Sequence, residues 1–352
     1  MSLMRSLCGN GLRFLSAILC MAKETTPKVS VIAPVYGVEQ FIGRAVESMM
    51  NQTLDDIEFI FVDDCTPDGS IGVLRDAIAR YPARKECVHI LRHDKNRGLP
   101  AARNTGLGVA RGEYIFHWDS DDYAESDMLE SLYNEAKATG SDYVWCDWYL
   151  TFSTNSRPMT QPSASTPREA LGILLSGGMK YNVWNKLVAR SLYDENGIRF
   201  PERRSMGEDM TMIKLLAKAK QVGHVAKPLY HYIRTNSGAM TQIYSQKHLD
   251  ELQCNTDDIC RYLADEIKDN AIAQELDWFK LNVKLPFLFS GRKSDMELWR
   301  CWYKEADKEI MSNHRQALRT RLLQWTAAHH MSAVNTLYNL LVFKFVYGII
   351  YR

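Results

Sequence analysis

The sequence predicts an α/β fold with a mostly parallel central sheet covered by helices, followed by a helical C-terminal region. Two observations lead to this prediction. Short apolar runs rich in β-branched residues alternate with segments of helical periodicity between residues 29 and 147. Regular alternation of this kind is typical of a parallel sheet with helices on both faces. Beyond residue 245, apolar residues recur at helical spacing.

The alternating elements follow one another in regular order. The strands are expected at 29–35, 57–62, 88–91, 114–118 and 143–146, with helices at 40–52, 71–79, 99–110 and 127–138. A stretch rich in Ser, Thr and Pro, residues 150–168, is expected to form a loop or linker. Further helices are expected at 249–267 and 296–310.

Composition excludes several classes of protein. The formal net charge is +1, so there is no general attraction to nucleic acid, and we expect no nucleic-acid partner. The eight cysteines are scattered, without a Cys-x-x-Cys pair. Such a distribution favours reduced thiols in a cytoplasmic compartment over a disulfide framework or a zinc site.

Polar residues follow the first four predicted strands at the point where each strand ends. They are Pro34 to Tyr36, Asp63 and Asp64, residues 94–98, and residues 119–122. Ligands of parallel sheets bind at the carboxyl ends of the strands, so these residues are expected along one rim. No Gly-x-Gly-x-x-Gly follows the first strand and no Walker loop is present, which argues against dinucleotide binding.

The acidic run Asp119-Ser120-Asp121-Asp122 carries the most chemical information. Clustered carboxylates raise one another's pKa unless a positive charge compensates them. A hard divalent cation held by one or two carboxylates completes its shell with water and substrate phosphates. The run therefore predicts a metal-bridged phosphate site. The alternative is an acidic turn that caps the next helix.

In their order and spacing, eight short motifs between Lys28 and about Thr241 resemble a family two inverting glycosyltransferase with the GT-A fold, of the bacterial polysaccharide-biosynthesis type. They are 29–36 (VSVIAPVY), 62–64 (VDD), 96–99 (NRGL), 102–107 (ARNTGL), 112–115 (GEYI), 119–122 (DSDD), 185–187 (NKL) and 207–209 (GED). The resemblance implies transfer of a sugar from a nucleotide-diphospho-sugar, by default a UDP-sugar, to a hydroxyl of a glycan or lipid-linked oligosaccharide.

The resemblance also implies roles for residues of the first half. Tyr36 would stack on the base, Pro34 would shape the base pocket, and Asp64 would accept hydrogen bonds from the base or ribose. Either Arg97 or Arg103 would hold the nucleotide. Asp119 would lie near the ribose and the metal, and Asp121 would be the principal ligand of a Mn²⁺ or Mg²⁺ ion.

In the second half, the resemblance implies that Asp209 is the catalytic base and that Glu208 orients the acceptor or the loop. Trp184, Asn185 and Lys186 would lie on the acceptor side. Alternatives stay open for several of these residues. Glu208 and Asp209 could simply begin a helix, and Trp184 could be a buried aromatic residue. His231 is either a metal or phosphate contact or an ordinary strand residue, and Arg234 and Ser237 are candidates for closing over the diphosphate.

We expect four regions along the chain. Residues 28–150 would bind the nucleotide-sugar, 151–241 would form the acceptor side, and 242–352 would be a helical region with a basic, apolar tail. Residues 1–27 would be an extension, either from a start site placed too far upstream or an interfacial segment. The tail segment 334–352 could contact the inner face of the cytoplasmic membrane peripherally, or dock on the core as a helix.

Two other functions compete with sugar transfer. A non-catalytic nucleotide-sugar-binding module or scaffold would most simply lack a metal carboxylate or the base, and the sequence has both. A sugar nucleotidyltransferase usually needs a basic, Gly-rich loop after the first strand. The segment 37–40, Gly-Val-Glu-Gln, does not provide one.

Overall fold

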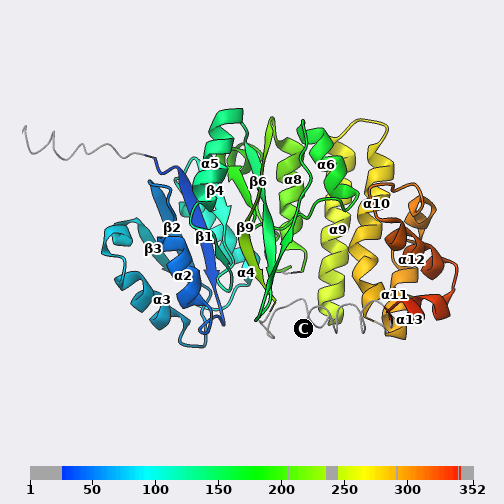
Figure 1. Ribbon diagram of the computed structural model, residues 1–352, viewed down its shortest axis with the longest axis horizontal. Helices are drawn as coiled ribbons and strands as arrows, with labels where there is room; N and C mark the ends of the chain where they lie inside the picture. Colours follow the sequence, from blue (N-terminus) through cyan, green and yellow to red (C-terminus); the bar gives the residue numbers. More distant parts are fainter. Residues whose placement is uncertain (1–25, 205, 235–244, 291, 340, 342–352) are drawn as a thin grey trace, which may run out of the picture.

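The protein is described by a computed structural model that covers residues 26–204, 206–234, 245–290, 292–339 and 341. A nine-stranded sheet runs through these residues, with helices around it and a block of helices at one end (Figure 1). The predicted α/β class with a helical C-terminal region is confirmed.

The strands are β1 Val29–Val35, β2 Ile57–Asp63, β3 Val88–Arg92, β4 Tyr114–His117, β5 Tyr123–Ala124, β6 Tyr143–Thr151, β7 Ser156–Met159, β8 Lys186–Ala189 and β9 Val222–Ile233. The α-helices are α2 Ile42–Met50, α3 Ser70–Ala79, α4 Leu99–Val109, α5 Met128–Thr139, α6 Pro167–Leu175, α7 Arg190–Glu195, α8 Thr211–Lys218, α9 Gln246–Glu266, α10 Ile272–Lys284, α11 Lys293–Cys301, α12 Leu318–Ala328 and α13 Ser332–Asn339. Four 3₁₀ helices in the described residues are η1 Pro82–Cys87, η2 Glu208–Met210, η3 Leu285–Phe289 and η4 Lys304–Glu309.

The first half of the sheet is parallel, in the order β3-β2-β1-β4. The chain moves outward from β1 to β3 and then returns past β1 to add β4 on the other side. Because crossovers are right-handed, α4 covers the opposite face from α2 and α3. The reversal makes the crevice between β1 and β4 a topological switch point, where ligands of open α/β sheets bind.

The second half of the sheet is mixed. The short strand β8 lies antiparallel between β4 and β6, while β6 and β9 pair in parallel. The prediction of a loop over 150–168 is wrong in part, because β6 continues to Thr151 and β7 pairs back on it. The expected boundary at residue 150 consequently lies within β6.

The core of the first half follows from its apolar sequence. Every residue of β2 is buried, and α2 turns Ile42, Ala45, Val46, Met49 and Met50 inward. Helix α4 packs on β1 so closely that a Cβ atom at Gly106 would lie 2.4 Å from Cγ2 of Ile32. A glycine is therefore required there, and it lets α4 lie directly on β1.

The C-terminal helices pack against α6 and α8 at one end of the sheet (Figure 1). The single helix predicted at 296–310 is wrong, since α11 ends at Cys301 and η4 begins at Lys304, with Tyr303 at a φ of 46°. The buried ammonium of Lys284 explains the break. Its Nζ donates to the carbonyl of Trp302 at 2.8 Å and to Oδ1 of Asp307 at 2.7 Å. In the described residues, no helix is both long and apolar enough to cross a bilayer.

Candidate active site

The carboxyl ends of β1 and β4 lie side by side at the switch point. The Ser120 hydroxyl donates to the carbonyl of Pro34 at 2.6 Å, which ties the acidic run after β4 to the end of β1. Tyr36 is 50% exposed, a rare state for an aromatic ring near the centre of a domain. An exposed ring at this position is free to stack on a planar ligand.

Asp64 organises the loop that leads into α4. Its Oδ1 accepts hydrogen bonds from the Arg97 amide at 2.8 Å and lies 2.6 Å from Nδ1 of His93, while Oδ2 accepts from the Gly98 amide at 2.8 Å. Gly98 has a φ of 89°, which suits glycine. Asp64 is buried, whereas the Arg97 side chain is 40% exposed and lies 3.5 Å from Glu202.

Arg103 lies beneath the acidic run. It projects from α4, and its side chain is only 1% exposed. Nη2 donates to Oδ1 of Asp119 at 2.8 Å, while Nε and Nη1 have no hydrogen-bond partner in the described part of the chain. The Asp119 side chain is 27% exposed and can still reach a ligand.

Glu208 and Asp209 enter the same charged cluster from the other half of the molecule. They form η2, which follows Gly207 in the left-handed region at a φ of 78°. Burial raises the pKa of Asp209 to about 6, against the lowering effects of Arg103 and Lys186. Burial raises the pKa of Glu208 to about 8, and the charge of Asp209 adds to this. Since Asp119 also acts on both carboxyl groups, Arg103 is the cation shared by three acids.

Comparison with known proteins identifies this arrangement. Residues 30–206, half of the chain, match the model of "Glycosyl transferase family 2". The chain belongs to this family. It is 30% identical over 313 residues to the uncharacterized glycosyltransferase EpsJ of Bacillus subtilis, covering 86% of this chain and 87% of that protein. The enzyme is also 34% identical over 244 residues to the cholesterol galactosyltransferase of Borreliella burgdorferi, covering 65% of this chain and 66% of the relative.

A solved structure has the same fold as this glycosyltransferase. Staphylococcus aureus TarS in complex with UDP-GlcNAc superimposes with a TM-score of 0.63 and 19% identity, covering 89% of each chain. The likeness shows the GT-A fold. The enzyme is thus a bacterial-type family 2 glycosyltransferase, as the sequence motifs predicted.

The remaining carboxylates of the glycosyltransferase's acidic run differ in what they do. Asp122 is buried, and both of its carboxylate oxygens accept hydrogen bonds from the protein. Oδ1 accepts from the Ile233 amide at 2.8 Å and Oδ2 from the Tyr230 hydroxyl at 3.0 Å. It therefore stabilises the end of β9 instead of capping α5. Asp121 is partly exposed. In the residues described, no group of three His, Cys, Asp or Glu side chains could enclose a metal ion.

Asn185 lies in the loop that precedes β8, and Lys186 is the first residue of that strand; both are buried. Asn185 donates from Nδ2 to the Cys146 carbonyl at 2.8 Å. Nζ of Lys186 donates to the carbonyls of Lys180 and Asn182 and to Oδ1 of Asn185, at 2.7–2.9 Å. Burial lowers the pKa of Lys186 to about 7, although Asp209 acts in the opposite direction. Both side chains therefore hold the segment 180–186 in place, and their acceptor-side role stays a prediction.

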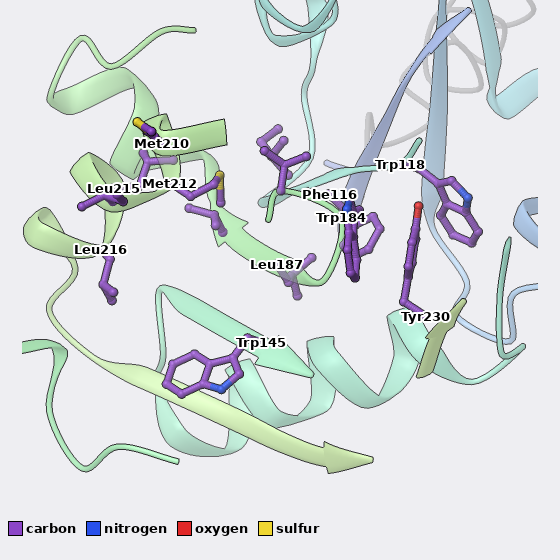
Figure 2. Packing of buried hydrophobic residues seen from close by; sticks show 14 of the residues in the cluster. Phe116, Trp118, Trp145, Trp184, Leu187, Met210, Met212, Leu215, Leu216 and Tyr230 are labelled. Atoms are coloured by element: carbon purple, nitrogen blue, oxygen red, sulfur yellow. The ribbon is translucent and has the colours of Figure 1, made fainter. Parts of the chain in front are cut away.

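Trp184 lies in an aromatic stack inside the enzyme. Its ring is stacked on Tyr230 at 4.7 Å and on Tyr232 at 5.4 Å, and only 6% of the residue is exposed. Figure 2 shows the Tyr230 ring between Trp184 and Trp118. Of the two interpretations of Trp184, acceptor-side residue or buried aromatic residue, these contacts are those of a buried aromatic residue.

The structure adds two residues to the site that the sequence did not single out. Tyr230 donates to Asp122 and accepts from the Asp119 amide at 3.2 Å, so it links both acids to β9. Asn104 exchanges two hydrogen bonds with the backbone of Phe200, both at 2.9 Å, and so connects α4 with the segment before Asp209. Side chains of a strand alternate between the two faces of the sheet, so residues 230 and 232 share one face and residue 231 lies on the other. This alternation could have indicated that Tyr230, and not His231, faces the site.

His231 is an ordinary strand residue in the described structure. Its ring is stacked between Tyr123 at 4.2 Å and Tyr149 at 4.5 Å. Its nitrogens lie 3.0 Å from the Thr151 hydroxyl and 2.9 Å from Oε1 of Glu125. Ser237, residues 1–25 and residues 342–352 lie outside the described residues, so the predictions made for them stay predictions.

Proposed function

We propose that this enzyme transfers a sugar from a UDP-sugar to a hydroxyl group of a glycan or lipid-linked oligosaccharide, with inversion at the anomeric carbon. The observation that carries the proposal is the environment of Asp209. Its pKa is raised to about 6, so the carboxylate is ionised at neutral pH and yet basic enough to accept a proton. A general base works best when its pKa lies near the working pH.

The chemical step would use Asp209 as the only proton acceptor. As the acceptor oxygen attacks the anomeric carbon, Asp209 takes the hydroxyl proton. The new glycosidic bond forms while the bond between the anomeric carbon and the diphosphate oxygen breaks. The electron pair leaves with the nucleoside diphosphate, and attack from the opposite face inverts the configuration. Glu208, which holds its proton at neutral pH because its pKa is raised to about 8, would donate a hydrogen bond to the acceptor or to the loop.

The donor side would bind the nucleotide through the first three strand ends. Tyr36 would stack on the base beside Pro34, and Asp64 would present the loop of Arg97. Of the two arginines, Arg97 is exposed and suits a contact with the nucleotide, whereas Arg103 is buried and suits control of the carboxylates. TarS, which shares the fold, was solved in complex with UDP-GlcNAc, and this supports UDP as the first nucleotide to test.

Asp119 and Asp121 would hold a Mn²⁺ or Mg²⁺ ion. Their chemistry fits, because hard cations bind carboxylate oxygens and take the remaining ligands from water and phosphate. Asp122 does not take part, since both of its oxygens are bonded to the protein. When bound, the cation would act as a Lewis acid and stabilise the charge of the departing diphosphate.

The names of two relatives bear on the acceptor. The name of the Borreliella relative gives a lipid, cholesterol, as its acceptor. Another relative, ExoO of Rhizobium meliloti, is named a succinoglycan biosynthesis protein, which supports a glycan acceptor and surface polysaccharide assembly at the cytoplasmic side of a membrane. Peripheral contact through residues 334–352 remains part of this proposal.

Calorimetric titration with UDP, GDP and TDP, each with Mn²⁺ and with a chelator, tests the donor side. Selective, metal-dependent binding of UDP is the expected result. Metal-independent binding would remove the role of Asp119 and Asp121, and no binding of any nucleotide would contradict the proposal. The matched variant Asp121→Asn should lose the metal dependence and keep the fold.

A further inference from the structure

Exposed apolar side chains concentrate in one part of the chain within the described residues. Of the ten large apolar residues that the described residues expose, eight follow residue 310: Met311, Leu318, Leu322, Trp325, Met331, Val334, Leu337 and Leu341. The other two, Tyr36 and Val109, are far apart in the sequence. Scattered exposed apolar residues need no explanation, but a concentration of them marks an interaction surface.

Helix α12 carries the most regular part of this surface. Leu318, Leu322 and Trp325 are spaced by four and three residues, so they share one face of the helix. They are 56%, 46% and 38% exposed, while Leu323 and Ala327 on the opposite face are buried. We call Leu318, Leu322 and Trp325 the α12 apolar face. The buried side already anchors the helix to the protein, so the apolar face is not needed for that packing.

The chain that carries the α12 apolar face has charge of one sign, although Glu297 on the neighbouring α11 is also exposed. No Asp or Glu occurs after Glu309 in the sequence, whereas Arg315, Arg319 and Arg321 lie before or within α12. On a helical projection, Arg319 and Arg321 lie on opposite sides of the apolar stripe. Helices that lie at the surface of anionic membranes typically carry leucine and tryptophan on one face, with arginine beside them.

Helix α13 continues the surface beside α12, which it contacts. Val334 and Leu337, one turn apart, are 45% and 55% exposed. In Figure 1, α13 lies at the lower edge of the molecule, the edge toward which β1 points, while β1 itself lies toward the other end of the long axis. The candidate site at the carboxyl ends of β1 and β4 and helix α13 are therefore at the same edge of the molecule.

We propose that the α12 apolar face, extended by α13, docks on an anionic phospholipid bilayer. Apolar side chains would enter the headgroup boundary, and the exposed Arg319 would face lipid phosphates. Arg321 instead donates to the Met311 carbonyl at 2.9 Å and lies beside the apolar face. A face-to-face contact with a second copy of the chain is less favourable, because it would bring the Arg319 side chains of the two copies together. The docking does not depend on sugar transfer; only its benefit for a lipid-linked acceptor rests on the proposed function.

Co-sedimentation of the full-length protein with vesicles tests the proposal. Vesicles of phosphatidylcholine alone and of phosphatidylcholine with phosphatidylglycerol are compared. The wild-type protein should bind the anionic vesicles, and the double variant L322Q/W325Q should bind them about tenfold more weakly or worse, because two apolar side chains are removed from the interface. The milder Leu318→Gln should weaken binding about threefold. Arg319→Gln should weaken binding to anionic vesicles about fivefold and leave neutral vesicles unaffected.

The matched control is Val109→Gln, which changes an apolar residue of similar exposure, 46%, outside the surface. It should bind like the wild type. A chain ending at Leu341 separates this surface from the tail, and it should retain the sensitivity to L322Q/W325Q. Far-UV circular dichroism and UDP titration show whether each variant is folded.

Two results would overturn the proposal. One is vesicle binding that L318Q and L322Q/W325Q leave unchanged. The other is a wild-type dimer in sedimentation equilibrium that L322Q/W325Q converts to a monomer, since a second copy would then cover the face. Failure of sugar transfer together with normal vesicle binding would contradict the proposed function alone. Transfer to a soluble acceptor without vesicle binding would contradict only the docking.

Discussion

The proposed donor side and acceptor side of the candidate active site are built in different ways. On the donor side, the strands β1 to β4 are all parallel, so the residues that follow them meet at one rim by sheet geometry alone. On the acceptor side, Glu208 and Asp209 arrive on a 3₁₀ turn whose position depends on the packing of Met210 and α8 against the core (Figure 2). Donor binding should therefore respond to local changes, and chemistry to changes in tertiary packing.

Arg103 joins the two sides. It originates in the parallel half and is bonded to Asp119, and its charge acts on Glu208 and Asp209. Because one buried cation serves three acids, the ionisation of the base depends on a residue from the donor half.

The largest effect is expected from Asp209→Asn. The amide cannot accept the acceptor proton, so kcat should fall by about a hundredfold to ten-thousandfold. Donor affinity should change little, because Asp209 belongs to the acceptor side. Steady-state kinetics with calorimetric titration of UDP measure both quantities. Equal losses of affinity and turnover would mean that the two sides are not separable in this way. Glu208→Gln, which keeps a hydrogen-bond donor, is the matched control and should retain most of the activity.

The same division explains what could be predicted from sequence. The strands β1 to β4 begin and end within one residue of their predicted bounds, because short apolar runs between polar ends leave few alternatives. The candidate donor residues could be grouped because parallel strands end at one edge. The antiparallel insertion of β8 between β4 and β6 could not be predicted, since Lys186 to Ala189 is too short to reveal its partners.

The environment of the candidate base could also not be predicted from the sequence. Nothing local to Glu208 and Asp209 indicates that Arg103, about a hundred residues earlier, lies beside them. Asn185 and Lys186 were expected near the acceptor, but their polar groups are satisfied by backbone carbonyls and by each other. A sequence motif indicates that such residues belong to the site. Only the packing distinguishes a residue that contacts the acceptor from one that supports the neighbouring backbone.

Trp184→Ala should give the next largest effect, on stability. The ring is buried and stacked on two tyrosines, so its removal should lower the free energy of unfolding by about 3–5 kcal/mol. Urea denaturation measures this. Trp184→Phe should recover much of the loss and leave the acceptor KM unchanged if the ring serves packing. A raised acceptor KM in a stable Trp184→Phe enzyme would instead make Trp184 part of the acceptor site.

The pH dependence tests the link through Arg103. Asp209 must be ionised to act as a base, and its pKa is raised to about 6, so kcat should fall as the pH decreases through about 6. The guanidinium lowers the pKa of Asp209. Replacement by the neutral glutamine should therefore move the midpoint to higher pH and reduce kcat at pH 7 by about tenfold.

Arg103→Lys keeps the charge and is the control for that experiment; its midpoint should stay closer to that of the wild type. Thermal melts of both variants show how much of any loss comes from instability of the buried acids. An unchanged midpoint in folded Arg103→Gln would show that the donor half does not control the base.

The smallest effect is expected from Tyr36→Ala. The ring is half-exposed at the end of β1, and stacking on a planar partner is worth about 0.5–1.5 kcal/mol. Donor affinity should therefore fall by about twofold to tenfold, with kcat at saturating donor unchanged. Tyr36→Phe keeps the ring and should bind like the wild type, because stacking needs no hydroxyl. Tyr36 belongs to the proposed donor side and Asp209 to the proposed acceptor side. A loss of kcat at saturating donor would therefore mean that stacking on the base also orients the anomeric carbon. The two sides of the site would then be coupled through the substrate as well as through Arg103.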